Sequence, residues 1–212
     1  MVTKKILITS GPTWVPIDNT RVISNISTGE TGLILAKKFA GLGAKVTLLL
    51  GPVNKCCVDK KIRVINFKYF DELLNLVNKE LKSKYDVVIH AAAVSDYRAQ
   101  KVSKKKVCSS LKYWKLDLVP LPKIIDRVKK VSPSSFLVGF KYEPCAKKEA
   151  LIKEARMLIS RTKADLVVAN SQNKGVYSAY IVEKNNISSP AHNKAEMVDK
   201  LINSIDKKLW KN

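Results

Sequence analysis

Cysteine and histidine are scarce in this sequence. Its 212 residues include four cysteines and two histidines, and no two cysteines have the C-x-x-C spacing that is typical of zinc and redox motifs. This composition argues against a structural zinc site. We expect free thiols at Cys56, Cys57, Cys108 and Cys145.

Long apolar runs are also missing. No run approaches the roughly 18 apolar residues of a membrane-spanning helix, and the first apolar run begins so close to Met1 that no room remains for a signal peptide. The 46% hydrophobic content is ample for a buried core. We therefore expect a cytoplasmic protein, without membrane contact, that forms a single domain over residues 1–212.

Acidic side chains are few. Eighteen Asp and Glu against 39 Lys and Arg give a formal net charge of +21, which would permit nucleic-acid binding. However, the lysines are spread over the whole chain, aromatic residues make up only 7%, and no RNA-recognition or helix-turn-helix motif is present. We expect a composition bias and no specific nucleic-acid partner, although a small phosphorylated ligand would benefit from the positive field. A basic nucleic-acid-binding protein remains an alternative.

The compact G-x-G-x-x-G turn of dinucleotide-binding domains is absent. Instead, a loop of about twenty residues, 11–32, separates the strand-like run Lys4–Ser10 from the helical pattern Leu33–Ala44, and a loop of this length is usually functional. Tyr97 and Lys101 have the Y-x-x-x-K spacing of short-chain dehydrogenases, so an NAD(P)-dependent reductase of that type is a second alternative. The missing glycine motif argues against it.

Strand-like and helix-like segments alternate along the chain. This order predicts an α/β fold, a Rossmann-like doubly wound and mostly parallel sheet with helices on both faces. Strands are expected at 4–10, 44–52, 62–67, 85–97, 114–119, 135–140, 164–170 and 178–184, and helices at 33–44, 71–83, 122–131, 146–162 and 194–208. The lysine-rich segment 98–115 shows neither the alternation of a strand nor the periodicity of a helix.

In such sheets the ligand lies beyond the carboxyl ends of the strands. The residues that follow the apolar runs should therefore converge on one site. These are the 11–32 loop, "AAAVSDY", the 98–115 segment, "GFKYE" and "ANSQNKG".

The 11–32 loop contains several candidate functional residues. Ser27 and Glu30 fit a capping box at the start of the helix, which is a structural explanation for both. A helix N-terminus also attracts anions, and Gly29 would let a phosphate approach the backbone. Arg21 could hold a phosphate or carboxylate with two hydrogen bonds, and Asn25 could donate to an oxygen that gains negative charge.

Later segments offer further ligand contacts. In "AAAVSDY" the small alanines leave room for a flat ring or an acyl chain, and Asp96 could accept from a ribose or base or help to hold Mg²⁺. The alanines could equally pack under a helix. Phe140 could stack on a base or belong to the core, and Lys141 points to the same site. The 98–115 segment is either a solvated charge run or a mobile lysine loop over a triphosphate.

The motifs "ITSGPTWVPIDNTRVISNISTGETG", "AAAVSDY", "KVCSS", "LPKII", "VGFK" and "ADLVVAN…YIVEKN" together resemble phosphopantothenate-cysteine ligase (phosphopantothenoylcysteine synthetase), in its monofunctional bacterial form. The resemblance extends from Lys5 to about Ile205. It implies that 4'-phosphopantothenate and CTP, or ATP in some members, form an acyl-nucleotidylate, which cysteine converts to an amide on the route to coenzyme A. It also implies Mg²⁺ and a homodimer.

The resemblance also implies roles for single residues. Asn25 matches the asparagine tied to the acyl intermediate, with Arg21 and Gly29 as its neighbours, and Lys106 matches the catalytic lysine of the mobile loop, with Lys104 or Lys105 as alternatives if the register shifts. Ser171 and Leu121 depart from the pattern, since aspartate and asparagine are common there. We expect catalytic groups at Arg21, Asn25 and Lys106, and substrate or nucleotide contacts at Gly11, Gly29, Ala92, Ala93, Asp96, Phe140, Lys141, Arg161 and Lys163.

Overall fold

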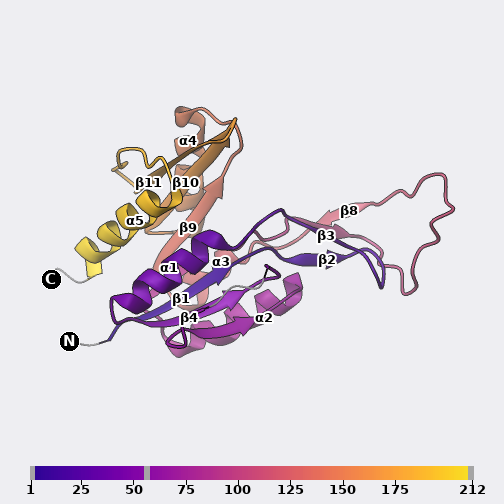
Figure 1. Cartoon of the computed structure of the whole chain (residues 1–212), viewed down its shortest axis with the longest axis horizontal. Helices are drawn as coiled ribbons and strands as arrows, with labels where there is room; N and C mark the ends of the chain where they lie inside the picture. The colour runs from indigo at the N-terminus through magenta and orange to yellow at the C-terminus, as the bar shows by residue number, and fades with distance from the viewer. Residues whose placement is uncertain (1–2, 55–57, 210–212) are drawn as a thin grey trace.

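The computed structural model describes residues 3–54 and 58–209. Its centre is a seven-stranded sheet with the order β11-β10-β9-β6-β1-β4-β5, in which only the β10–β11 pair is antiparallel. This arrangement confirms the expected mostly parallel α/β fold (Figure 1). The strands are β1 (Lys5–Ser10), β4 (Lys45–Leu50), β5 (Arg63–Asn66), β6 (Val87–His90), β9 (Phe136–Tyr142), β10 (Leu166–Asn173) and β11 (Val176–Val182).

Helices cover both faces of the sheet. On one face, Leu35 of α1 and Leu201 of α5 join a core cluster, and on the other face α2, α3 and α4 build a second cluster. The side chains of β1 point alternately to the two faces of the sheet. Ile6 belongs to the first cluster and Leu7 to the second, and both are fully buried. Both faces are covered, which explains why the strands are nearly continuous apolar runs. The helices are α1 (Glu30–Gly41), α2 (Phe70–Glu80), α3 (Ile125–Val131), α4 (Lys148–Thr162) and α5 (Lys194–Leu209), and the short 3₁₀ helix η1 (Leu81–Ser83) follows α2.

Two short hairpins extend from the carboxyl edge of the sheet and form what we call the arm (Figure 1). One hairpin pairs β2 (Trp14–Pro16) with β3 (Val22–Ser24), and the other pairs β7 (Tyr97–Ala99) with β8 (Leu118–Pro120). The long loop expected at 11–32 thus contains an ordered hairpin. Residues 100–117, which we call the lysine loop, connect β7 to β8 without regular structure.

The strand expected at 85–97 is wrong in its second half, since β6 ends at His90. Beyond it, residues 91–96 run as a loop beside the chain that follows β1: the Ala91 amide donates to the Thr9 carbonyl at 3.1 Å, and the Ala93 amide donates to the Gly11 carbonyl at 2.9 Å. The strand expected at 114–119 is likewise reduced to β8.

The capping box expected at Ser27 and Glu30 is wrong. The N-cap of α1 is Gly29, which has a φ of 70° and no side-chain cap, and the Glu30 carboxylate pairs with Lys194 instead. Close packing explains the glycine: the Ser10 hydroxyl donates to the Gly29 carbonyl at 2.8 Å, and a Cβ on Gly29 would lie 2.9 Å from a methyl of Val53. A side chain here would meet both backbone strain and a clash.

Cys108 and Cys145 are free thiols, as expected, whereas Cys56 and Cys57 lie outside the described residues. Within the described part of the chain, no helix combines the length and the apolar character needed to cross a membrane.

Candidate functional site

The strand order reverses between β1 and β6. From β1 the chain continues to β4 and β5 on one side, and from β6 it continues to β9 and β10 on the other. In open α/β sheets, ligands bind beyond the carboxyl ends of the strands at such a switch point. The candidate site is therefore the edge where β1 ends at Ser10 and β6 ends at His90.

The loop at 91–96 brings Asn25 to this edge. The Asn25 amide nitrogen donates to the carbonyls of Ala93 at 3.2 Å and Val94 at 3.0 Å. The structure thus places the arm asparagine, Ala92 and Ala93 together, as a shared site requires. In this conformation the amide is already hydrogen-bonded to protein, so its donation to a substrate oxygen stays a prediction.

Asp96 lies at the end of the same loop. Its exposed carboxylate pairs with Lys123, and its backbone carbonyl accepts from the Leu121 amide at 2.8 Å. Asp96 therefore joins two motifs that are apart in sequence, "AAAVSDY" and "LPKII". Within the ranges 3–54 and 58–209, no group of three or more His, Cys, Asp or Glu side chains could hold a metal ion by itself.

Arg21 contacts the lysine loop. Its guanidinium pairs with Asp18 at 2.9 Å, donates to the Val107 carbonyl at 3.2 Å and lies 5.4 Å from the centroid of the Trp114 ring. These contacts join the β2–β3 hairpin to residues more than eighty positions later. The expected contact of Arg21 with a phosphate stays a prediction.

Asp18 is a site-region residue that the sequence analysis missed. Its side chain is 0% exposed and accepts from the backbone amides of Thr20 at 2.8 Å, Arg21 at 2.7 Å and Val107 at 3.1 Å. Burial alone would raise the pKa of Asp18, but the hydrogen bonds from Thr20, Val107 and Arg21 hold it well below its usual range. The Asp-x-Thr pattern, which is typical of an Asx turn, was the available signal.

Two hydrogen-bonded attachments join the first half of the lysine loop to the β2–β3 hairpin. The Ser103 amide donates to the Ile17 carbonyl at 3.1 Å, and Val107 bonds to Asp18. Lys106 lies directly before this second attachment and is exposed. In the described structure the side chain of Lys106 forms no ion pair, so its charge is available to a ligand. Closure of the loop as a mobile lid stays a prediction.

Lys141 and Phe140 occupy opposite faces at the end of β9. The Lys141 ammonium lies 2.7 Å from Glu143 and 3.3 Å from Glu154; burial opposes its charge, but the two carboxylates raise the pKa of Lys141. Phe140 is half-buried and packs against the cluster under α1 and α5. Both residues are thus engaged with protein, and their contacts with a nucleotide stay predictions.

Arg161 and Lys163 are not brought to this edge. They lie at the carboxyl end of α4, where Arg161 pairs with Asp126 and Lys163 terminates the helix with a φ of 59°. Since α4 returns from the end of β9 to the start of β10, both residues lie at the opposite edge of the sheet. Within one chain they do not join the other candidates.

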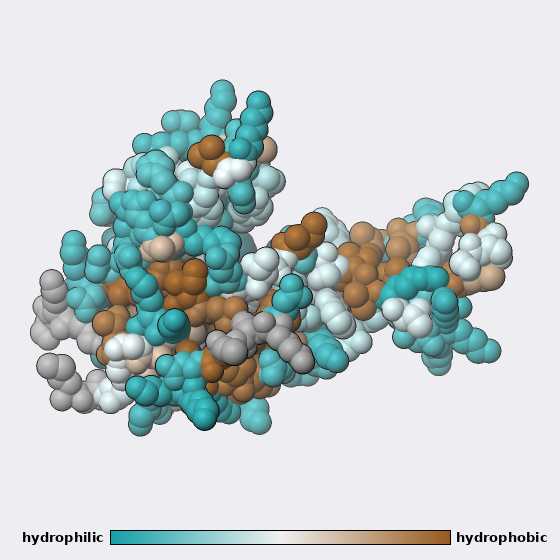
Figure 2. Space-filling model, viewed as in Figure 1, coloured by the Kyte–Doolittle hydropathy of each residue, from teal (hydrophilic) through white to brown (hydrophobic). Residues whose placement is uncertain are grey.

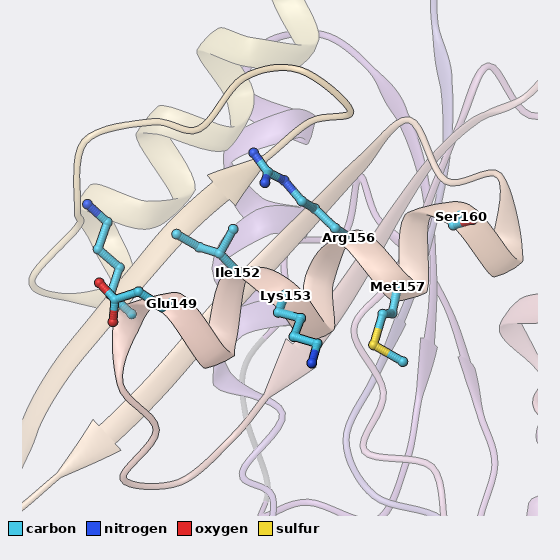
Figure 3. A pocket seen from close by; sticks show the side chains of 7 residues that line it. Glu149, Ile152, Lys153, Arg156, Met157 and Ser160 are labelled. Carbon is cyan, nitrogen blue, oxygen red and sulfur yellow. The ribbon is translucent and has the colours of Figure 1, made fainter.

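Two hollows of the described structure also lie away from the switch point. One, of about 540 Å³, is lined entirely by α4 side chains along its outer face, including Ile152, Arg156 and Met157 (Figure 3). Another, of about 710 Å³, lies at the carboxyl end of α4 and includes Lys163. Neither contains a residue of the arm or of the 91–96 loop, so the topology and the hydrogen bonds identify the site, not a cavity.

The structure does not form the arrangement of a short-chain reductase. Tyr97 lies in β7 and Lys101 follows the end of that strand, so the pair does not share a helix. In the second half of β10, two buried side-chain atoms have no hydrogen-bond partner among the described residues: Asn170 Oδ1 and Ser171 Oγ. Ser171 is the position where the family pattern commonly has aspartate.

The chain is similar to known proteins along nearly its whole length. A curated coenzyme A biosynthesis bifunctional protein CoaBC from Thermococcus kodakarensis is 38% identical over 97% of this chain, and the chain spans about half (52%) of that relative's length. The crystal structure of the DNA/pantothenate metabolism flavoprotein from Streptococcus pneumoniae matches with a TM-score of 0.88 at 28% identity, covering 97% of this chain and all of that one. Neither the reductase nor the nucleic-acid alternative gains support.

A structure of the C-terminal domain of coenzyme A biosynthesis bifunctional protein CoaBC shares the fold, with a TM-score of 0.80 at 24% identity over 99% of this chain and 97% of that chain. The family model described as the DNA/pantothenate metabolism flavoprotein C-terminal domain matches residues 1–209. The chain therefore belongs to the family of the DNA/pantothenate metabolism flavoprotein C-terminal domain.

Proposed function

We propose that this protein is a phosphopantothenate-cysteine ligase of coenzyme A biosynthesis, formed as one domain over residues 1–212. The observation that carries the proposal is the meeting of Asn25, Ala93 and Asp96 at the switch point of the sheet. These residues come from two motifs of the ligase pattern that are some seventy positions apart in sequence. The name of the 38% identical relative places that protein in coenzyme A biosynthesis, which supports the same assignment.

The proposed reaction has two steps. The carboxylate of 4'-phosphopantothenate attacks the α-phosphorus of the nucleoside triphosphate, and the bond to pyrophosphate breaks. The amine of cysteine then attacks the acyl carbon of the acyl-nucleotidylate, the nucleoside monophosphate leaves, and the amine loses a proton as the amide forms. The protein mainly has to position the reactants and stabilise negative charge.

The residues at the site fit these tasks. Lys106, whose charge is unpaired among the described residues, would approach the triphosphate from the lysine loop. Asn25 would exchange its bonds to the Ala93 and Val94 carbonyls for an oxygen of the acyl phosphate. Arg21 would hold the lysine loop in place through Asp18.

Asp96 is the residue that fits Mg²⁺. Its carboxylate is exposed and bonded only to a lysine among the described residues, and Mg²⁺ in nucleotide sites takes one or two carboxylates, with phosphate oxygens and water as its other ligands. When bound, the metal would neutralise part of the triphosphate charge. We propose CTP as the nucleotide, with ATP as the alternative, on the ligase resemblance of the chain.

The arm suits a homodimer. Figure 2 shows hydrophobic residues gathered on this projection. Large exposed side chains here include Val22, Tyr97 and Leu118 of the hairpins and Tyr113 of the lysine loop. Apolar groups gathered on one projection, away from the core, are typical of an interface. We propose that a second copy covers the arm in the cytoplasm.

The ligase proposal can be tested with purified protein. The chain is incubated with phosphopantothenate, cysteine, Mg²⁺ and either CTP or ATP, and pyrophosphate is measured. We expect first-turnover pyrophosphate that needs phosphopantothenate and one nucleotide but not cysteine, because activation precedes amide formation. Pyrophosphate release that ignores phosphopantothenate would overturn the proposal, and a strict need for cysteine in the first turnover would remove the two-step scheme.

A further inference from the structure

His90 is a buried histidine at the centre of the candidate site. It is the last residue of β6, it pairs in register with Thr9 of β1 on one side and Gly139 of β9 on the other, and it is 8% exposed. It therefore lies at the carboxyl edge, on the strand that leads into the alanines of the 91–96 loop. The family pattern described above gives this position no role.

The hydrogen bonds around Thr9 fix the tautomer of His90. The Thr9 hydroxyl oxygen accepts from the Ala92 amide at 3.2 Å and lies 3.0 Å from His90 Nδ1. Thr9 is 1% exposed, and its hydroxyl proton has no other acceptor among the described residues. The hydroxyl therefore donates to Nδ1, so the ring proton of the neutral imidazole is on Nε2.

The Nε2–H group has no partner in the described protein. Only two polar side-chain atoms of the described residues are buried without a hydrogen bond, Asn170 Oδ1 and Ser171 Oγ, and His90 Nε2 is not one of them. No described residue hydrogen-bonds to Nε2 either. Nε2 is thus without a hydrogen bond from the described residues, on a strand end at the carboxyl edge of the sheet where a ligand is expected.

The ring is also uncharged at physiological pH. Burial lowers the pKa of His90 to about 4, and no charged side chain contributes to this shift. A neutral imidazole is a hydrogen-bond donor that cannot protonate a carboxylate, whereas an imidazolium would pair with it. A neutral donor can therefore orient the attacking carboxylate without suppressing its attack.

We propose that His90 is a further substrate-binding and catalytic residue, whose neutral Nε2–H donates to an oxygen of the acyl group at the reacting centre. The inference rests on the ligase function proposed above. It adds a second donor to Asn25, whose side-chain nitrogen bonds to two backbone carbonyls in this conformation. No proton is transferred by His90.

Two variants separate this role from a structural one. His90→Gln keeps an N–H donor near the position of Nε2 but loses the acceptor for Thr9. His90→Asn keeps an acceptor for Thr9 but loses the outward donor. We expect His90→Asn to lower first-turnover pyrophosphate by about 10²–10³-fold, the effect of losing one oxyanion donor, and His90→Gln to retain most of the rate. Thermal melts of both variants show whether each is folded.

The reverse order, with His90→Asn active and His90→Gln inactive although folded, would show that His90 only supports Thr9 and would overturn the inference alone. A wild-type protein without phosphopantothenate-dependent pyrophosphate would overturn the ligase function and this inference with it. A second readout needs no activity. In ¹⁵N NMR spectra we expect the proton of His90 on Nε2, without titration between pH 5.5 and 8, and a proton on Nδ1 or a titration in that window would refute the argument.

Discussion

The hydroxyl of Tyr85 should stabilise the amino edge of the sheet, and Tyr85→Phe tests this. Tyr85 is 7% exposed, and its hydroxyl donates to the Glu80 carboxylate at 2.6 Å and lies 2.9 Å from the Thr47 hydroxyl. Arg63 holds the same carboxylate with two hydrogen bonds, of 2.8 and 3.1 Å. The network joins β4, β5 and α2 through one buried acid.

A hydrogen bond to a charged group contributes about 1.5–3 kcal/mol. We therefore expect Tyr85→Phe to lower the free energy of unfolding by about 2 kcal/mol at pH 7, because Glu80 loses one donor but keeps Arg63. For a chain of this size that corresponds to a fall in Tm of about 4–8 °C. Tyr113→Phe is the matched control, since Tyr113 is 86% exposed, and should change neither quantity.

The effect should depend on pH. Burial alone would raise the pKa of Glu80, but Tyr85 and Arg63 lower it below its ordinary value of 4.5. A carboxylate with a lowered pKa contributes stability above that ordinary value, and this stability is lost as the pH falls through the folded pKa. The difference between wild type and Tyr85→Phe should therefore be largest near pH 7 and shrink below about pH 4.5.

Urea unfolding followed by circular dichroism at pH 7 and pH 4 measures both expectations. A loss below about 0.5 kcal/mol at pH 7, which is the lower limit for an ordinary hydrogen bond, would show that the hydroxyl does not stabilise the Glu80 carboxylate. A loss that grows on acidification would refute the pKa argument.

Three further predictions concern the candidate site. Asn25→Asp should slow pyrophosphate release by about a hundredfold without a change in the circular dichroism spectrum, because its carboxylate would face the acyl phosphate; near-normal turnover would leave Asn25 a purely structural residue. Lys106→Gln should abolish first-turnover pyrophosphate while phosphopantothenate binding, measured by calorimetry, survives, and Lys112→Gln is the control; equal mild losses would make the lysine loop a diffuse positive surface. Asp18→Asn replaces one acceptor oxygen by an NH₂ group facing the Val107 amide, so proteolysis within 100–117 should become faster, and unchanged cleavage would contradict the proposed tether.

The central strands could be predicted from sequence because burial on both faces makes a strand apolar throughout. The run Val87–Ile89 needs no partner information to be identified, although its end at His90 does. The hairpins of the arm escaped because strands of three residues, such as β2 and β7, are too short to show a period. In addition, β7 and β8 pair across the whole lysine loop.

The sequence predicts those site residues whose position follows from the strand order of the sheet. The convergence of Asn25 and Ala93 follows from the rule that ligands lie beyond the carboxyl ends of strands. The same rule argues against Arg161, because a helix that follows a strand returns to the opposite edge. The partnership of Arg21 with Asp18 and Val107 could not be predicted, because it depends on how the lysine loop folds back on the hairpin.

The pairing of the two chain segments at the root of the arm, where it leaves the sheet, links the arm to the candidate site. The chain segments that leave β1 and β6 stay paired beyond the sheet through the bridge between Pro12 and Ala93, and Thr13 and Ser95 then bond to each other through their hydroxyls and backbone. The root of the arm is therefore attached to the sheet at the switch point by two segments that are hydrogen-bonded to each other. If a second copy covers the arm, as proposed above, a displacement of the arm would reach Asn25 and the 91–96 loop through these paired segments, so that assembly and the geometry of the site would be coupled.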